Sequence, residues 1–313
     1  MTMKTIIISS CLVFATLIGH SALAQGGSPL YRSTDNGKSW HTSDQGLNEA
    51  VRVDQIMSFK KQYFILTEGQ GLYVSSNQGK SWSKPGFSMF LPAKGDVIHA
   101  YNDLLWLGTY RDGVLVSADQ GNSWVPCIKG LRDLTIRAFH SHEENIWVGT
   151  NDGVYLWNAT DKAWDQQLEG VQVNDFSQQG NRLFVATHQG MQRSIDQGQH
   201  WETVLEEGAV KQLYRWNMQL YACSMHRKIW RYDPAKDIWN DATGFFPTAG
   251  LSTTILHGDE EVIYVTQERK LYRKFTTQGQ WELVSNGLSN AAAFRDLTMV
   301  QPGVLLLACT AKP

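Results

Sequence analysis

An eight-residue motif recurs along the chain and limits the possible fold more than any other feature. Its best copies run from Ser33 to Trp40, Ser75 to Trp82, Ser117 to Trp124 and Ser194 to Trp201. Degenerate copies that keep little more than the tryptophan end at Trp164, Trp239 and Trp281. The seven copies are about forty residues apart, and self-similarity at such a period indicates a repeat architecture.

A second motif agrees with this count. A short run of β-forming residues that ends in Thr or Ser occurs once per repeat, with its last residues at Thr67, Thr109, Thr150, Thr187, Ser224, Thr266 and Thr310. Several short strands and turns in each unit of about forty residues are typical of propeller blades. We therefore predict an all-β protein, a seven-bladed β-propeller of four-stranded antiparallel blades.

The two motifs are out of step at the ends of the chain. The first box, Ser33 to Trp40, has no β-run before it, and the last run, Val304 to Thr310, has no box after it. We predict that the N- and C-terminal strands share one blade. Phe294 to Val300 and Val304 to Thr310 would supply its inner strands, and Leu30 to Ser33 with the strand after Trp40 its outer ones. Such closure removes open sheet edges.

The first 24 residues have the pattern of a secretory signal peptide. Lys4 precedes an apolar run from Thr5 to Ile18, and Ala22-Leu23-Ala24 forms a small-x-small cleavage site. Cys11 lies inside the apolar run, which argues against a lipoprotein signal. We expect residues 25–313 to form one exported domain, periplasmic or extracellular. No later segment approaches the roughly 20 apolar residues of a membrane span.

Charge and cysteine content exclude several classes of protein. Lys and Arg number 28 and Asp and Glu 30, with no dense basic stripe, so a nucleic-acid partner is not expected. After the signal peptide the cysteines are Cys127, Cys223 and Cys309. This odd, low count predicts a free thiol and excludes a disulfide scaffold. We expect a monomer without a cofactor.

The S-x-D-x-G-x-S-W copies resemble the Asp-box, or BNR, repeats of sialidases, sortilin-type receptors, xyloglucanases and photosystem assembly propellers. The resemblance covers nearly the whole chain after the signal peptide and implies the fold, not the activity. In such a box the acid or amide accepts hydrogen bonds from its own turn, the glycine allows positive φ, and the tryptophan packs on a neighbouring strand. We interpret these box residues as structural: Asp35, Gly37, Trp40, Asn77, Gly79, Trp82, Asp119, Gly121, Trp124, Asp196, Gly198 and Trp201.

The resemblance also implies where a ligand would bind. If the strands of a blade run A to D from the axis outward, the box is the C–D turn, and ligands of similar propellers sit on the opposite face, on the B–C and D–A loops. Counting thirteen residues back from the end of each strand B gives polar residues near the axis. They are Asp54, Asp96, Arg137, Asn174, Lys211, Thr253 and, allowing one extra residue, Asp296.

Three of these residues, Asp54, Asp96 and Asp296, fall in consecutive blades and are candidate catalytic carboxylates. Crowded carboxylates raise one another's pKa, bind a cation or bind hydroxyl-rich ligands. The alternative is that they simply hydrogen-bond to water and to neighbouring blades.

Loops on the same face supply candidate binding residues. Late blades are the more basic, which suits an acidic partner surface or an anionic sugar, and two D–A connections are aromatic. Those aromatic residues would anchor a partner or a sugar, or else close over the channel as lids. The binding candidates are Arg111, Asp112, Arg137, Asp152, His188, Lys211, His226, Arg227, Arg269, Phe90, Phe245 and Phe246.

The sequence favours binding over catalysis. The arginine cluster of a sialidase, with its usual Arg-Ile-Pro segment, is absent, and a xyloglucanase cleft lies between two propellers. His140-Ser141-His142 is interpreted as part of a surface turn, and no metal site is predicted. We predict an exported, non-catalytic propeller that binds a protein or glycan partner on its B–C and D–A face, as a scaffold or in assembly. The alternative is a glycoside hydrolase acting on extracellular polysaccharide with two of Asp54, Asp96, Asp112, Asp152 and Asp296.

Overall fold

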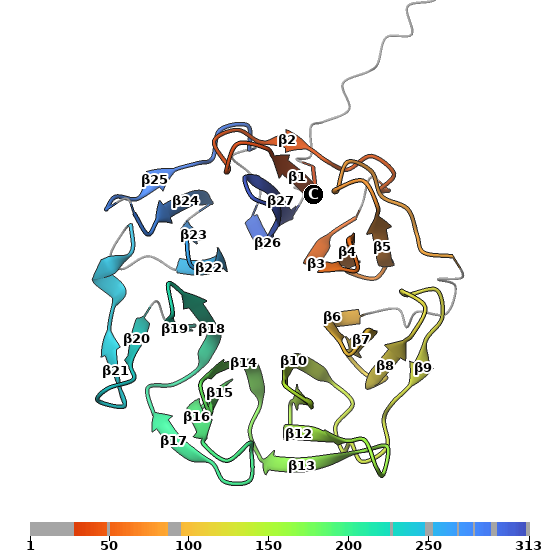
Figure 1. Cartoon of the computed structure of the whole chain (residues 1–313), viewed down its shortest axis with the longest axis vertical. Helices are drawn as coiled ribbons and strands as arrows, with labels where there is room; N and C mark the ends of the chain where they lie inside the picture. Colours follow the sequence, from red (N-terminus) through yellow and green to blue (C-terminus); the bar gives the residue numbers. More distant parts are fainter. Residues whose placement is uncertain are drawn as a thin grey trace, which may run out of the picture.

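The chain forms a ring of seven sheets around a central axis (Figure 1). The computed structural model describes residues 28–48, 51–86, 95–225, 228–247, 253–267, 269–277, 279–288 and 293–310. The predicted signal peptide lies outside these ranges. In each blade the first strand is nearest the axis and later strands lie progressively outward (Figure 1). The seven-bladed all-β propeller is confirmed.

The first four blades follow the chain in order. Blade 1 contains β3 (Val53–Phe59), β4 (Gln62–Thr67) and β5 (Gly71–Ser75). Blade 2 contains β6 (Gly95–Tyr101), β7 (Leu104–Thr109), β8 (Val114–Ser117) and β9 (Val125–Pro126). Blade 3 contains β10 (Ile136–His142), β11 (Asn145–Thr150), β12 (Gly153–Asn158) and β13 (Ala163–Glu169). Blade 4 contains β14 (Val173–Gln179), β15 (Arg182–Thr187), β16 (Gly190–Ser194) and β17 (Glu202–Leu205).

The remaining three blades complete the ring. Blade 5 contains β18 (Val210–Trp216), β19 (Gln219–Ser224), β20 (Ile229–Asp233) and β21 (Ile238–Asp241), followed by the short 3-10 helix η2 (Thr243–Phe245). Blade 6 contains β22 (Thr253–Gly258), β23 (Val262–Gln267), β24 (Lys270–Phe275) and β25 (Glu282–Leu283). Blade 7 contains β26 (Ala293–Gln301), β27 (Val304–Thr310), β1 (Leu30–Ser33) and β2 (His41–Thr42).

Blade 7 joins the two ends of the chain, as predicted. Its strand order is β2-β1-β27-β26, and β1 pairs antiparallel with β27 in a register that places Leu30 opposite Ala308. Blade 1 differs from the predicted four strands, because its fourth strand is reduced to one bridge between Val74 and Ser83. Pro85 follows two residues later and has no N–H for a longer ladder.

The second strand of each blade forms the middle of the core. In β4, for example, Phe64, Ile65 and Leu66 are all essentially inaccessible to solvent. Both faces of a blade are covered by neighbouring blades, so these strands are continuously apolar instead of alternating. This explains why the second strands are the clearest β signal in the sequence.

Some of the box tryptophans join neighbouring blades through main-chain carbonyls, whereas the indoles of Trp124 and Trp201 donate to the glycine of their own box. The backbone N–H of Trp40 donates to Asn286 O at 3.1 Å and its indole N–H donates to Val284 O at 2.9 Å. Trp82 contacts Gln45 O and Ser43 O in the same way, and Trp164 contacts Lys129 O and Cys127 O. Each pair of carbonyls belongs to the D–A connection of the preceding blade.

A Gly-Leu pair occurs in each D–A connection whose carbonyls accept these hydrogen bonds. The pairs are Gly46-Leu47, Gly130-Leu131 and Gly287-Leu288, and each glycine follows a box tryptophan position by six residues. The three glycines have φ between 86° and 93°. Sequence reasoning missed this repeat, although its fixed offset from Trp40, Trp124 and Trp281 was a sufficient signal.

The third strand of blades 4 to 7 carries an arginine, and in blades 4, 6 and 7 this arginine bonds to the next blade. Arg32 donates from Nε to Gln78 O at 3.1 Å, and Arg273 donates to Asn36 O. Arg193 and Arg231 hold the same register position, which in blades 1 to 3 is occupied by Val74, Val116 and Leu156. At this register position, the third strand therefore carries an arginine in blades 4 to 7 and an aliphatic residue in blades 1 to 3.

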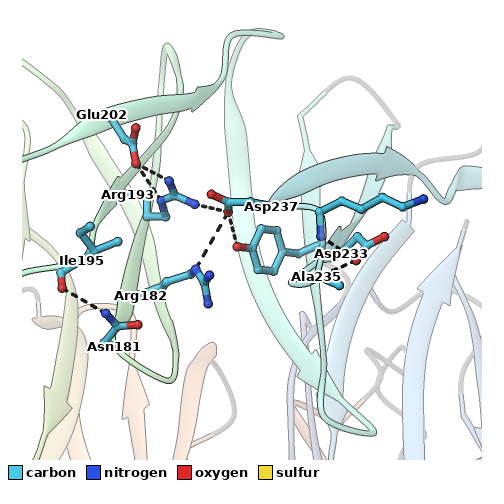
Figure 2. Close-up of polar contacts among 10 residues, drawn as sticks. Asn181, Arg182, Arg193, Ile195, Glu202, Asp233, Ala235 and Asp237 are labelled. Atoms are coloured by element: carbon cyan, nitrogen blue, oxygen red, sulfur yellow. Dashed lines mark hydrogen bonds and ion pairs between the residues drawn. The ribbon is translucent and has the colours of Figure 1, made fainter.

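The ion network around Arg193 leads to a stability prediction. Arg193 bonds to Glu202 of its own blade and to Asp237 of blade 5, and Asp237 also accepts from Tyr232 (Figure 2). The Arg193 side chain is only 9% exposed. Arg193→Met should lower the free energy of unfolding by about 1–3 kcal/mol, because both acids lose a nearly buried partner.

Urea unfolding of Arg193→Met and of the control Arg231→Met measures this effect. Arg231 holds the equivalent position in blade 5 but is exposed, so its replacement should change stability by less than about 0.5 kcal/mol. Equal losses in the two variants would show that the network adds nothing to stability.

Candidate functional site

The acids of the boxes are fully engaged within their own turns. Asp35 accepts from the backbone N–H of Ser39 at 2.9 Å and from its hydroxyl at 2.6 Å, while Ser33 Oγ accepts from Gly37 N at 2.8 Å. Partial burial raises the pKa of Asp35, but the bonds from Ser39 and Ser33 outweigh this and hold it at about 2. An ionised carboxylate with both oxygens bonded is a turn clamp, not a proton donor.

Polar residues near the axis tie the inner strands of adjacent blades together. Register shifts place Asp54, Arg137, Asn174 and Lys211 at β-bulges near the start of their strands. Arg137 Nε donates to Val173 O at 2.7 Å, and Asn174 Nδ2 donates to Val210 O at 2.7 Å. These contacts match the simpler of the two alternatives for the ring, bonding between blades.

The prediction that Asp296 shares the ring position of Asp54 and Asp96 is wrong. Arg295 occupies the bulge of β26, and Asp296 is the next residue. A second irregularity between Met299 and Gln301 shifts the count along this strand. The side chain of Asp96 lies outside the described residues.

Asp296 instead belongs to a second set of contacts between blades. Its Oδ2 accepts from the backbone N–H of Ile56 at 2.7 Å, which joins blade 7 to blade 1. Asp175 Oδ2 accepts from Leu213 N at 2.8 Å, which joins blade 4 to blade 5. Gln55 makes the corresponding contact with Ile98 through its amide. Sequence reasoning missed Asp175, which directly follows the ring residue Asn174.

Burial has a large effect on these two carboxyl groups. It raises the pKa of Asp175 to about 7 and that of Asp296 to about 6, although backbone N–H donors act in the opposite direction. Raised carboxyl pKa values are typical of catalytic acids and also of buried structural acids. Here each carboxylate uses both oxygens on backbone N–H groups, and the two belong to different blades. The arrangement is structural.

The predicted binding residues of the B–C turns do lie on one side of their blades. Arg111, Asp112, His188 and Arg269 are exposed, Lys211 is exposed at its bulge, and Asp152 is partly buried. The turns are short and closed by the threonine of the second strand. Thr109 Oγ1, for example, donates to Gly113 O at 2.9 Å. This face therefore presents separate charged side chains on well-braced turns.

The aromatic D–A candidates differ from the prediction. Phe246 is 4% exposed and Phe245 38%, and both pack with Trp216, Tyr221 and Trp281 at the junction of blades 5 and 6. Phe245 O accepts from the Trp281 indole N–H at 3.0 Å. Phe246 is thus a core residue, because the short η2 turn directs it between the blades, and neither ring is a lid over the channel. Phe90, His226 and Arg227 lie outside the described residues.

A cavity of about 970 Å³ opens between blades 3 and 4, on the face that carries the A–B and C–D turns. This blade 3–4 cavity lies on the face opposite to the one predicted. Its lining comes from the A–B turns of both blades, the box of blade 4 and one residue of blade 5. The polar lining residues are His140, Ser141, His142, Glu143, Asn145, Ser177, Gln178, Asn181, Asp196, Gln197, Gln199 and Arg215.

Aromatic residues form the floor of the blade 3–4 cavity. His140 stacks on Phe176 with ring centroids 6.1 Å apart and lies 5.7 Å from the ring of Trp147. Burial lowers the pKa of His140, so its imidazole is neutral near pH 7, and Nε2 lies 3.1 Å from Gln178 Oε1. The indole N–H of Trp147 is buried and has no hydrogen-bond partner among the described residues. The site is therefore neutral at its base and rich in amides around it.

The two histidines of this region face different partners. His142 Nε2 lies 3.8 Å from Glu143 Oε1, whereas His140 faces Gln178. Within the described ranges, no group of three or more His, Cys, Asp or Glu residues is arranged to hold a metal ion.

No helix among the described residues combines the length and apolarity needed to cross a membrane.

One protein-family model matches the N-terminal half of the chain. The family model Sortilin-Vps10, described as sortilin, neurotensin receptor 3, matches residues 28–192, more than half of the chain. The chain belongs to the Sortilin-Vps10 family. A search of curated proteins gave no significant match.

Solved structures share the propeller fold at low sequence identity. An extracellular domain of a two-component system from B. thetaiotaomicron superposes with a TM-score of 0.66 at 14% identity, covering 90% of this chain and 39% of that one. YCF48 bound to D1 peptide gives 0.59 at 14% identity, covering 90% and 86%. An ancestral GH74 enzyme gives 0.59 at 15% identity, covering 76% and 39%. This member of the Sortilin-Vps10 family thus spans about two fifths of the first structure and most of the YCF48 structure.

Proposed function

We propose that this chain is an exported, non-catalytic propeller that binds a segment of a partner protein in its blade 3–4 cavity, in a scaffold or assembly role. The observation that carries the proposal is the lining of that cavity, a neutral floor surrounded by the amides of Asn145, Gln178, Asn181, Gln197 and Gln199. Side-chain amides both donate and accept, which suits the peptide groups of an extended segment.

Two features favour a protein partner over a glycan. Sugars bind through stacking on exposed aromatic faces, but the rings on the cavity floor are covered, with Trp147 1% and Phe176 6% exposed. Ile195, by contrast, is 56% exposed at the edge of the cavity and offers an apolar contact to a peptide side chain. YCF48, which matches nearly this whole chain, was solved with a bound peptide.

The carboxylates at hand argue against glycoside hydrolysis at this site. That reaction needs an acid and a second carboxylate roughly 5–10 Å apart on either side of the scissile bond. Glu143 and Asp196 line the cavity, but Asp196 is held in its box by Ser194 and His200. The candidates Asp54 and Asp96 remain to be tested as catalytic residues by substitution.

Paired substitutions on opposite faces test the proposal. Gln199→Lys introduces a residue that the chain already carries at the same box position as Lys38 and Lys80, so folding should be preserved. Gln199→Lys combined with Asn181→Arg should weaken binding of a co-purified partner by about tenfold or more, because two long cations would replace two of the amides that line the cavity. Arg111→Glu, on the face predicted from sequence, should leave the affinity unchanged.

Surface-immobilised variants titrated with the purified partner give the measurement. A loss confined to Arg111→Glu would move the site to the B–C face and refute the cavity. Turnover of chromogenic glycosides that disappears in Asp54→Asn or Asp96→Asn would contradict the non-catalytic assignment.

A further inference from the structure

A second, apolar cavity lies on the outer rim between blades 2 and 3, away from the blade 3–4 cavity. This rim groove has a volume of about 600 Å³, and its apolar lining includes Leu104, Trp106, Val116, Val125, Ile128 and Trp157. Two of these side chains face solvent, since Val125 is 67% and Ile128 40% exposed. Exposed apolar residues gathered in a concave surface are a feature of interaction sites.

The groove exists because two elements that close other junctions are both missing here. In blades 4, 6 and 7 an arginine of the third strand bonds to the next blade, but blade 2 has Val116 at that position. Blades 2 and 4 present an Asp-box to the blade before them, but the C–D turn of blade 3, residues 158–162, carries none. Among the seven junctions, that of blades 2 and 3 alone combines an aliphatic third-strand residue with a boxless turn.

Two lysines flank this apolar surface. Lys129 and Lys162 are exposed, and among the described residues they are the charged side chains that line the groove. Lys129 Nζ donates to Asp161 O at 3.0 Å, which holds its ammonium group beside the opening. A ligand that places an apolar group in the groove would therefore meet positive charge next to it.

We propose that the rim groove is a docking site for a second protein, which inserts one or two apolar side chains next to a carboxylate. Charge complementarity to Lys129 and Lys162 selects the acidic residue, and the volume accommodates side-chain anchors of the kind that dominate protein interfaces. The site is independent of the proposed function, because it shares none of its lining residues with the blade 3–4 cavity.

Recognition at this groove proceeds through side chains. The adjacent edge strand β9 has only two residues, and Pro126 has no N–H to donate to an added strand. Strand addition, which relies on main-chain hydrogen bonds, is therefore blocked at this edge. An inserted side chain needs no such donor.

Cys127 lines the groove and provides a specific reporter. It is partly exposed, whereas Cys223 and Cys309 are buried and serve as internal controls for unfolding. Burial raises the pKa of the Cys127 thiol to about 11, so alkylation by iodoacetamide at about pH 9 should be slow enough to follow by mass spectrometry.

The probes are three synthetic octapeptides that differ in one property each. The first contains two leucines and two glutamates, the second replaces the leucines with serine, and the third replaces the glutamates with lysine. At about 1 mM the first peptide should slow Cys127 alkylation by about fivefold or more, and the other two should have no effect. In a Val125→Asp, Ile128→Asp variant this protection should be lost, and in Lys129→Glu, Lys162→Glu it should move to the lysine peptide.

Each other outcome would overturn the proposal in a distinct way. Equal or absent protection by the three peptides would remove the claimed selectivity. Stronger protection by dodecanoate than by the first peptide would identify a lipid site. Protection that rises with protein concentration alone, together with dimer formation in light scattering, would identify a second copy of the chain as the occupant.

Discussion

Gly46→Ala is expected to lower the free energy of unfolding by about 3 kcal/mol or more, a larger effect than most single substitutions have. A Cβ on Gly46 would lie 2.1 Å from the backbone oxygen of Trp82, and the residue has φ of +88°. The clash is with main chain that is itself hydrogen-bonded to Gln45 O, so it cannot be relieved by a side-chain rotation. The junction of blades 7 and 1 would have to open.

Gly170→Ala is a matched control for this substitution. Gly170 also has a positive φ, +74°, but a Cβ there would have no neighbour within 4 Å. Its replacement should cost only the backbone conformational penalty of about 1 kcal/mol. Equilibrium urea unfolding of both variants separates the steric clash from the backbone penalty. Comparable losses would mean that the close approach of Trp82 to Gly46 makes no contribution of its own to stability.

Asp175 is expected to make stability depend on pH. Its folded-state pKa of about 7 lies above the ordinary value near 3.8, so the folded chain retains a proton that the unfolded chain releases. Its contribution to stability is therefore complete below about pH 4 and is lost as the pH rises through about 7. Because Asp175 as a residue is partly rather than fully buried, we expect a change of about 1–3 kcal/mol over this range.

Asp175→Asn tests this directly. The amide cannot titrate, yet its oxygen can still accept from Leu213 N. As the pH rises from about 4.5 to about 8, the unfolding free energy of the wild type should fall relative to that of the variant. Asp296 and the buried histidines are unchanged in both proteins and cancel. Parallel pH curves for wild type and Asp175→Asn would contradict the prediction.

Residue patterns were sufficient to predict the ring, its seven blades and the shared terminal blade. These features depend on local signals, namely turn residues at fixed offsets and short apolar strands, which each repeat carries by itself. The structural interpretation of the boxes depends on contacts within eight residues, such as those of Asp35 with Ser33 and Ser39. Local chemistry of this kind can be read from sequence.

The candidate sites were predicted less well, because they depend on contacts between blades. Counting along the strands misplaced Asp296 by one residue, since a β-bulge changes which face a side chain takes. Phe246 looked like an exposed anchor, but packing against Trp281 of the next blade buries it. Neither the bulge nor the packing can be recognised from the sequence of the segment that contains the residue.

The sequence by itself determined the repeat, the strand order within each blade and the closure of the ring. Only the tertiary structure decided where the surface is hollow: the blade 3–4 cavity on the face of the boxes, and the rim groove where Val116 faces a boxless turn. The physical reason is that a strand pattern reports which side chains must be buried. A cavity depends instead on whether the partners that two neighbouring blades bring together fill the space between them.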